Sequence, residues 1–352
     1  MIRRALLAIG AVALPLASFG VIARRGADRL LAGPRVGGDE SGIGPRLDAL
    51  GGEVVRIRSR DGVRLAGRWL PADPSVDAGW KPEPDEAILL LHGYSGSVAP
   101  DLVEYGPTLR ATAAVLGLDF RGHGGSADGP TTFGALEVED VAGALAWLGE
   151  RGVARVAIVG TSMGGMTALA AVAILGDGSL TGVDAVPDAP RGALAIRPRI
   201  VAVVGDSVSP EIGLVVANRI NGPFRRGPFR RLVADRLLAA AGRRIGADLR
   251  ATEPIRIVGL VAPVPLLLIH GDADTTVPIG AGRRLAAAAG PTATHWIVSG
   301  AEHSGSHALI PDAWDARVRA FLRAGFTGAR NVAAIIGPPG TEGELAAHRG
   351  PG

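Results

Sequence analysis

The chain has 352 residues, which is enough for one large α/β domain with extensions at its ends. Hydrophobic residues make up 47% and charged residues 20%, a balance that is typical of globular proteins and argues against general disorder. The formal net charge is only +3 and no nucleic-acid recognition motif accompanies it, so we expect no nucleic-acid partner. The absence of cysteine excludes disulfides, thiolate metal sites and a cysteine nucleophile.

Residues 1–35 differ in composition from the rest of the chain. Two arginines precede an uncharged, mostly apolar run at residues 5–23, and two more follow it. As a helix this run would be roughly 28 Å long, about the thickness of a bilayer core. We therefore expect residues 1–35 to anchor the protein in a membrane with a single pass. The alternatives are a cleaved signal peptide, which would leave a secreted protein, and a buried helix. The flanking arginines do not fix the side of the membrane.

Residues 36–50 are rich in glycine and polar groups and are predicted to be a linker, whereas residues 51–325 alternate between strands and helices. Asp61-Gly62 predicts a hairpin between the first two strands. Short apolar strands are expected at 87–91, 113–118, 154–159, 200–204, 265–269 and 295–298. Helices with an apolar face are expected around 138–148 and 314–322, and a further helix at 163–175. This alternation predicts an α/β fold, with a mostly parallel sheet and helices on both faces.

The alternation pauses at residues 206–258, between two predicted strands. This segment is rich in arginine, and its apolar residues recur at helical spacing. We expect a helical insertion that acts as a lid. Its arginines are interpreted as a solvated helix face, with contacts to acidic substrate groups or anionic lipid as the alternative. Residues 326–352 are rich in glycine and proline and are predicted to be a flexible tail.

The strongest chemical signal is the sequence G-T-S-M-G at residues 160–164, directly after a predicted strand and directly before a predicted helix. This is the G-x-S-x-G pattern in the strand–turn–helix context that it requires. The turn is so tight that side chains two residues either side of Ser162 would clash, which explains Gly160 and Gly164. We predict that Ser162 is a nucleophile rather than a structural serine at a helix start.

A second loop follows the predicted strand at 87–91 and begins with His92 and Gly93. An oxyanion hole needs two hydrogen-bond donors that point at the same oxygen. We expect the backbone N–H groups of Tyr94 and Met163 to form this oxyanion hole, with Gly93 allowing a close approach. His92 is interpreted as a residue that packs the loop.

Two acids and two histidines follow later strands. The acid of a catalytic triad must orient the imidazole and balance its charge. We predict Asp274 as this acid and interpret Asp272 as a loop-shaping residue that bonds to nearby backbone N–H groups. We predict His303 as the base, with His307 as the alternative.

The remaining polar motifs are assigned structural roles. The glycine-rich turn at residues 119–126 is interpreted as structural, with a substrate contact at the rim of the site as the alternative. No cluster of histidine and acidic residues has metal-ligand spacing, and no glycine-rich loop has phosphate-binding spacing. We therefore expect neither a metal nor a cofactor.

Together, five motifs resemble the α/β-hydrolase superfamily over about residues 52–325. In chain order they are His92-Gly93, D-x-R-G-x-G at 119–124, G-x-S-x-G at 160–164, H-G-x-x-D at 270–274, and His303. They look closest to membrane-anchored bacterial members related to the serine aminopeptidase and dienelactone-hydrolase-like branches. The resemblance implies an eight-stranded, mostly parallel sheet, a lid after the sixth strand, and the chain order Ser, Asp, His.

These observations favour a serine hydrolase that cleaves a carboxylic ester through an acyl-enzyme. The expected substrate is a small-molecule or lipid-like acyl compound, although the H-G-G-G sequence of one lipase subgroup is missing. A peptidase or amidase with the same three residues is an alternative. A membrane-tethered binding protein with a relic site is another, because a fold alone does not decide function.

Overall fold

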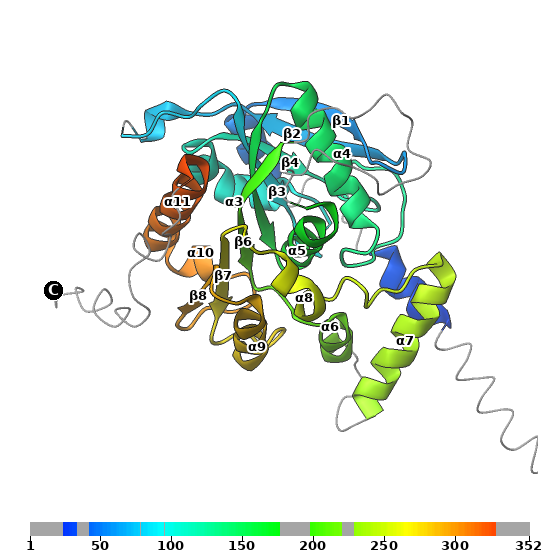
Figure 1. The fold of residues 1–352 in the computed structure, drawn as a ribbon. Coiled ribbons are helices and arrows are strands. Elements are labelled where there is room, and N and C mark those ends of the chain that lie inside the picture. The colour runs from blue at the N-terminus through cyan, green and yellow to red at the C-terminus, as the bar shows by residue number, and fades with distance from the viewer. Residues whose placement is uncertain are drawn as a thin grey trace, which may run out of the picture.

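The computed structural model describes residues 24–33, 42–77, 79–94, 96–176, 198–219 and 229–328. At its centre is an eight-stranded sheet with the strand order β1-β2-β4-β3-β5-β6-β7-β8, and helices cover both of its faces (Figure 1). Apart from β2, which runs antiparallel to both β1 and β4, neighbouring strands are parallel. The prediction of a mostly parallel α/β-hydrolase fold is therefore confirmed.

The strands form where the sequence places short apolar runs. Their bounds are β1 Glu53–Arg58, β2 Arg64–Leu70, β3 Glu86–Leu91, β4 Ala114–Leu118, β5 Arg155–Thr161, β6 Arg199–Asp206, β7 Leu266–Gly271 and β8 Ala293–Val298. Every residue of β3 and of β7 is buried, as expected for inner strands that are covered on both faces.

The helices around the sheet form two layers. Their bounds are α2 Ile43–Leu50, α3 Ala99–Arg110, α4 Glu137–Glu150, α5 Met163–Leu175, α9 Ile279–Ala289, α10 Ser306–Leu309 and α11 Pro311–Thr327. One apolar core joins α4, α5 and α9 to the sheet, and a second joins α3 and α11 to the other face. Helix α5 is buried along most of its length, so it is apolar all round rather than on one face.

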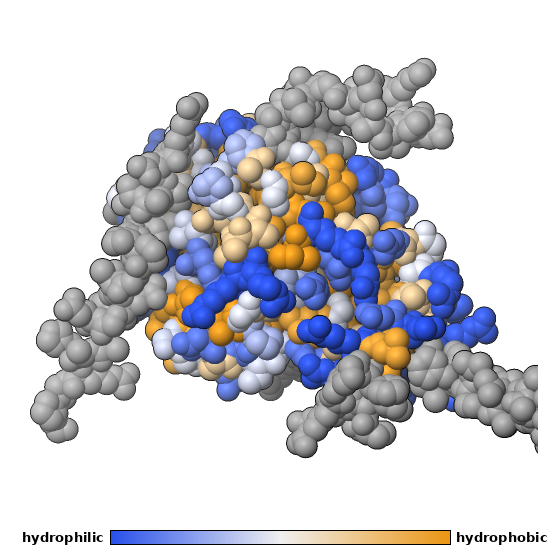
Figure 2. Space-filling view, turned by 60° about the horizontal axis from the view of Figure 1, so that its bottom comes forward, coloured by the Kyte–Doolittle hydropathy of each residue, from blue (hydrophilic) through white to orange (hydrophobic). Residues whose placement is uncertain are grey.

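The insertion between β6 and β7 is helical, as predicted. It contains α6 Ile212–Arg219, α7 Phe229–Ile245, α8 Pro254–Ile257 and a short 3₁₀ turn at Val258–Leu260. It begins later than the predicted residue 206, because Asp206 still pairs with Thr161 as the last residue of β6. Seen from the side of α6 to α9, the surface carries several separate hydrophobic patches among hydrophilic ones (Figure 2).

The predicted anchor at residues 1–35 is described only in part, since residues 5–23 lie outside the described ranges. Residues 24–32 form a helix, here called the N-terminal helix, and its Ala27 and Leu31 are buried in the first core. It lies against α7 (Figure 1), where Asp28 and Arg244 form an ion pair of 3.0 Å. Among the residues that the structure describes, no helix is long and apolar enough to cross a membrane.

Helices α2 and α3 are among the elements that were not expected from the sequence. The predicted linker at 36–50 is wrong for its second half, because residues 43–50 form α2, whose Leu47 and Leu50 pack against the second core. Helix α3 has proline at its start and inside it, which weakens the helical signal. Tertiary packing stabilises both helices. The predicted tail begins late too, since α11 continues to Thr327, and residues 329–352 lie outside the described part of the chain.

Candidate active site

The parallel strands end at one edge of the sheet, and the loops that follow them carry the polar residues singled out above. Ligand and active sites of open parallel α/β sheets lie at this carboxyl edge. The loops after β3, β5, β7 and β8 carry, in that order, Tyr94, Ser162, Asp274 and His303. Their separation along the chain is large, but the strand order places their loops next to one another.

Ser162 occupies a strained turn between β5 and α5. Its backbone angles are φ 51° and ψ −109°, a region that non-glycine residues rarely adopt. A Cβ at Gly160 would lie 2.5 Å from the backbone of Gly164, and a Cβ at Gly164 would overlap with the carbonyl of Leu91. Both glycines are therefore required by close backbone approach. The turn presents the Ser162 hydroxyl above the N-terminus of α5, where the helix dipole favours negative charge.

The structure brings Ser162, His303 and Asp274 into one hydrogen-bonded chain. The Nε2 atom of His303 lies 3.0 Å from the Oγ atom of Ser162, and its Nδ1 atom lies 2.7 Å from the Oδ2 atom of Asp274. The Asp274 side chain is fully buried, whereas that of His303 is 23% exposed. This arrangement lets the imidazole accept the serine proton while a fixed carboxylate orients it.

Asp274 is itself held rigidly. Its Oδ1 atom accepts hydrogen bonds from the backbone N–H groups of Thr276 at 2.8 Å and Val277 at 2.7 Å. These bonds occupy one carboxylate oxygen and direct the other at the imidazole of His303.

The two alternative residues lie elsewhere. Asp272 accepts hydrogen bonds from the hydroxyl of Ser299 and the backbone N–H of Gly300, and so shapes its loop as expected. His307 lies between Glu104 and Asp315, with contacts of 3.1 and 3.3 Å. Although burial opposes it, this pair of carboxylates raises the pKa of His307 to about 9. Neither residue contacts Ser162.

The loop after β3 lies directly against the nucleophile turn. A Cβ at Gly93 would be 3.4 Å from the carbonyl of Thr161 and 3.5 Å from the Cβ of Ser162. The next residue is Tyr94, whose ring stacks on Phe133 at a centroid distance of 5.4 Å. Met163 is the first residue of α5, where backbone N–H groups have no acceptor within the helix. The two predicted oxyanion donors thus belong to segments that flank Ser162.

His92, at the start of this loop, has the packing role expected of it. It is fully buried, its Nδ1 atom lies 2.6 Å from the carbonyl of Gly93, and its Nε2 atom accepts the N–H of Phe120 at 3.1 Å. Burial and the neighbouring His123 lower the pKa of His92 to about 3, so it stays neutral. The Asp119–Ser126 turn also has a structural role, because the Arg121 guanidinium forms hydrogen bonds to Asp61 and Asp140.

One further residue, Asp206, supports the site and was not predicted from the sequence. Asp206, at the end of β6, accepts the backbone N–H of Ser162 through its main-chain carbonyl at 2.8 Å. Its buried Oδ1 atom accepts the hydroxyl of Ser207 at 2.8 Å, and that hydroxyl accepts the backbone N–H of Ser304 at 2.9 Å. Ser304 follows His303 and has a φ of 57°. One residue therefore supports both the nucleophile turn and the base loop.

Burial raises the pKa of Asp206 to about 6, against the opposing effect of the Ser207 hydrogen bond. The signal in the sequence is an acid at the carboxyl end of a predicted strand, but the segment from residue 206 onward was assigned to the insertion. Asp101 of α3 is a second acid in this region, with a buried Oδ2 atom, and desolvation followed by the charge of Glu104 raises its pKa to about 8.

Metal ligands are not gathered anywhere in the described ranges: no group of three or more histidine, cysteine or acidic residues there has the geometry of a metal site.

Comparison with known proteins agrees with this architecture. The chain is 29% identical over 279 residues to an uncharacterized protein of Mycobacterium tuberculosis, covering 76% of each chain. It is similar in structure to the Pyrococcus furiosus esterase Pf2001, with a TM-score of 0.58 and 23% identity, over 84% of this chain and 97% of that one. It is also similar to a bacterial membrane phospholipase A, with a TM-score of 0.52 and 18% identity over 93% and 99% of the two chains.

At these identities the two solved structures establish a shared fold and no more. The family comparison extends further, because the model of the alpha/beta hydrolase family matches residues 88–327, which is more than half of the chain and contains Ser162, Asp274 and His303. The chain therefore belongs to the alpha/beta hydrolase family, and this membership supports its assignment as a hydrolase.

Proposed function

We propose that the protein is a serine hydrolase that cleaves carboxylic esters through an acyl-enzyme. The observation that carries this proposal is the hydrogen-bonded chain from Ser162 through His303 to Asp274, at a strained turn above a helix N-terminus. A serine hydroxyl is a weak nucleophile by itself, and an adjacent base that is oriented by a third group activates it. Each of these requirements is met by a residue at hydrogen-bond distance.

The reaction has two halves. His303 takes the proton of the Ser162 hydroxyl while the Ser162 oxygen attacks the ester carbonyl. The oxyanion that forms accepts hydrogen bonds from the backbone N–H groups of Tyr94 and Met163. His303 then donates the proton to the leaving alcohol, which breaks the ester bond and leaves an acyl group on Ser162. In the second half, water gives a proton to His303 and attacks the acyl carbonyl. The tetrahedral intermediate then collapses, His303 returns the proton to the Ser162 oxygen as the acyl–oxygen bond breaks, and the acid leaves.

The substrate of this proposal is a lipid-like acyl ester. The choice of a lipid-like substrate is supported by the helical insertion, which we propose to act as a lid over the carboxyl edge of the sheet. Leu232 on α7 and Leu260 after α8 are large hydrophobic residues of the insertion that remain 46% and 65% exposed. Such residues suit contact with an apolar chain or surface.

We propose further that residues 1–35 tether the enzyme to a membrane by the apolar run at 5–23. The N-terminal helix that follows this run packs on α7, with Gly26 beside Leu237 and the Arg244–Asp28 ion pair next to it. The backbone N–H of Thr131 also donates to the carbonyl of Leu31 at 2.7 Å. A tether joined to the lid in this way would bring the site close to lipid substrates.

The direct test is labelling of the full-length chain, purified in nonionic detergent, with a fluorophosphonate probe beside Ser162→Ala. Labelling of the wild type and none of the variant is expected, because the probe reacts only with an activated serine. The same preparation is then assayed on p-nitrophenyl esters and on the matching p-nitroanilides. Turnover of esters but not of anilides supports the proposal, whereas faster turnover of anilides favours a peptidase or amidase.

A folded wild-type protein that neither reacts with the probe nor turns over any ester would refute the proposed activity. The full-length chain is needed, because a shortened chain that begins after residue 33 would lose the contacts of the N-terminal helix with α7. Membrane attachment is tested separately, by fractionation of cells that express the chain with and without residues 1–23. Release of the shortened chain into the soluble fraction is the expected result.

A further inference from the structure

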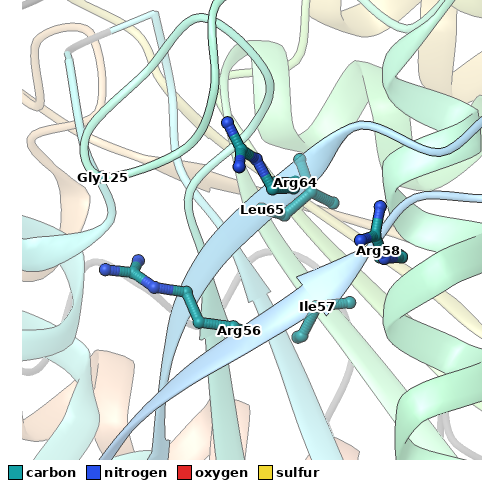
Figure 3. A pocket seen from close by; sticks show the side chains of 6 residues that line it. All are labelled: Arg56, Ile57, Arg58, Arg64, Leu65 and Gly125. Atoms are coloured by element: carbon teal, nitrogen blue, oxygen red, sulfur yellow. The ribbon is translucent and has the colours of Figure 1, made fainter.

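An open pocket of about 490 Å³ lies on the β1–β2 hairpin rather than beside Ser162. Six residues line it: Arg56, Ile57, Arg58, Arg64, Leu65 and Gly125. Figure 3 shows the side chains of Arg56 and Arg64 extending from the two strands toward the side on which the loop at Gly125 lies. None of the residues assigned to the proposed reaction contributes to this pocket.

The three arginines share one face of the hairpin. Arg58 and Arg64 are directly opposite each other in the antiparallel register, and Arg56 precedes Arg58 by two positions. Since successive side chains of a strand point to opposite faces, residues two apart and directly opposed residues lie on the same face. The intervening pair, Ile57 and Leu65, is buried at 3% and 1% exposure.

None of these three guanidinium groups forms an ion pair with a described residue, and Arg58 makes only a long hydrogen bond of 3.5 Å to the carbonyl of Gly62. The other two arginines of the hairpin differ in this respect. Arg60 and Arg68 each meet a carboxylate, at 2.5 and 3.5 Å. Among the described residues, no ion pair within 4 Å therefore neutralises these three guanidinium groups, although the Asp119 carboxylate interacts electrostatically with Arg56.

Like charges directly opposite each other destabilise a sheet. Charged residues on an edge strand also prevent edge-to-edge aggregation, and β1 is an edge strand. Edge protection does not account for this arrangement, because Arg64 lies on the inner strand β2 and protection does not require three charges of one sign on one face. An anionic ligand would neutralise the three charges together.

We propose that this pocket binds a phosphate group, carried by a soluble phosphate ester or by an anionic lipid headgroup. Guanidinium groups bind phosphate oxygens with paired, charge-assisted hydrogen bonds. Gly125 keeps the wall beside them free of a side chain, since a Cβ there would lie 3.6 Å from an Nη atom of Arg56 and 3.0 Å from the Cβ of Ala66.

The nearest acid of the loop, Asp119, interacts electrostatically with Arg56 but forms no ion pair with any of the three arginines. The Asp119 carboxylate already accepts the backbone N–H of Val98 at 2.8 Å and that of Gly125 at 2.9 Å. These bonds also connect the pocket wall to the loop that carries Tyr94. A phosphate bound between the arginines would lie at the same edge of the sheet as Ser162, with β4 and β3 between the two sites.

The test is a binding experiment on the full-length protein in nonionic detergent, so it does not depend on the proposed ester hydrolysis. The wild type is titrated by calorimetry with sn-glycerol 3-phosphate and, separately, with mixed micelles that contain phosphatidylglycerol or phosphatidylcholine. The pocket variant is R56Q/R58Q/R64Q. The control variant is R46Q/R151Q/R283Q, which removes the same charge from exposed arginines on α2, directly after α4, and on α9.

We expect the wild type and the control to bind, and the pocket variant to lose about tenfold or more in affinity, since one hydrogen bond to a charged group contributes a factor of that size. Binding of glycerol phosphate identifies a soluble ligand, and binding only of phosphatidylglycerol micelles identifies a lipid headgroup. Failure of the wild type to bind either probe overturns the proposal, as does an equal loss in the control variant. Thermal unfolding of all three proteins shows whether a loss of binding follows from a loss of folding.

Discussion

Ser207→Ala tests the connection between the buried acid Asp206 and the base loop. The hydroxyl of Ser207 is fully buried, donates to Asp206 at 2.8 Å and accepts the backbone N–H of Ser304 at 2.9 Å. Alanine removes both hydrogen bonds but keeps the backbone bond from residue 207 to the carbonyl of Ile269. The substitution therefore removes support from the residue that follows His303 without touching His303 itself.

The magnitude follows from the groups that are left unpaired. Removing one partner of a buried hydrogen bond costs about 1–3 kcal/mol, and here a carboxylate oxygen and a partly buried N–H each lose a partner. We expect the free energy of unfolding to fall by about 2–4 kcal/mol. For a domain of this size, the melting temperature falls by about 2–4 °C for each kcal/mol.

The catalytic effect is expected in kcat rather than in KM. Without the Ser207 hydroxyl, the left-handed backbone at Ser304 is no longer held, and the imidazole of His303 shifts from the Ser162 hydroxyl. A displacement of about 1 Å in a catalytic group costs about a hundredfold in rate. We expect kcat for a p-nitrophenyl ester to fall between tenfold and a hundredfold, with KM changed less than threefold.

Ser299→Ala is the matched control, because the Ser299 hydroxyl also bonds to an acid of a neighbouring loop, Asp272, but forms no hydrogen bond to His303 or Ser304. We expect its kcat to stay within twofold of the wild type. If Ser207→Ala lowers the melting temperature and leaves kcat unchanged, the hydroxyl stabilises the fold without positioning the base, and the reasoning above is refuted.

Three further substitutions probe the same region. Asp274→Asn should lower kcat by about a thousandfold or more, since the paired imidazole loses its charge partner and adopts the wrong tautomer; a loss below tenfold in the ester assay would contradict this role. In the folded protein the pKa of Asp101 is about 8, whereas in the unfolded chain it has its usual value of 3.8. Between these two pH values the unfolded chain loses the proton and the folded protein keeps it, which favours unfolding. The contribution of Asp101 to stability is therefore fully present below about pH 4 and is lost as the pH rises to about 8. Asp101→Asn should therefore flatten the fall of the free energy of unfolding between pH 5 and 8, by up to a few kcal/mol, and an unchanged slope would exclude Asp101 as its source. Gly160→Ala should abolish fluorophosphonate labelling because its Cβ meets the backbone of Gly164 at 2.5 Å, whereas Gly280→Ala, which meets nothing within 4 Å, should label normally.

Much of the architecture was predictable because it depends on local patterns. The hairpin at Asp61-Gly62, the short apolar runs and helix 163–175 each follow from turn chemistry or from the period of burial. The elements that were missed depend on packing instead. Helix α2 is held by Leu47 and Leu50 against the second core, although its sequence is rich in residues that favour loops.

The site shows the same division. The G-x-S-x-G turn was recognisable because its glycines are required within five residues of chain, where sequence and backbone geometry are directly linked. The contribution of Asp206 was not recognisable, because it depends on a hydrogen bond to Ser162 and on a link to Ser304 through the Ser207 hydroxyl, and these residues are distant from each other in sequence. The arginine face on β1 and β2 likewise required the register that places Arg58 opposite Arg64.

By itself, the sequence determined the nucleophile turn, the order of the strands along the chain and the loops on which the acids and histidines lie. Only the tertiary structure decided that Asp274 rather than Asp272, and His303 rather than His307, complete a hydrogen-bonded chain with Ser162. It also decided that residues 24–32 pack on α7. The physical reason is that a turn is fixed by neighbouring residues, whereas contacts between loops depend on the sheet order and on distances of a few ångströms across it.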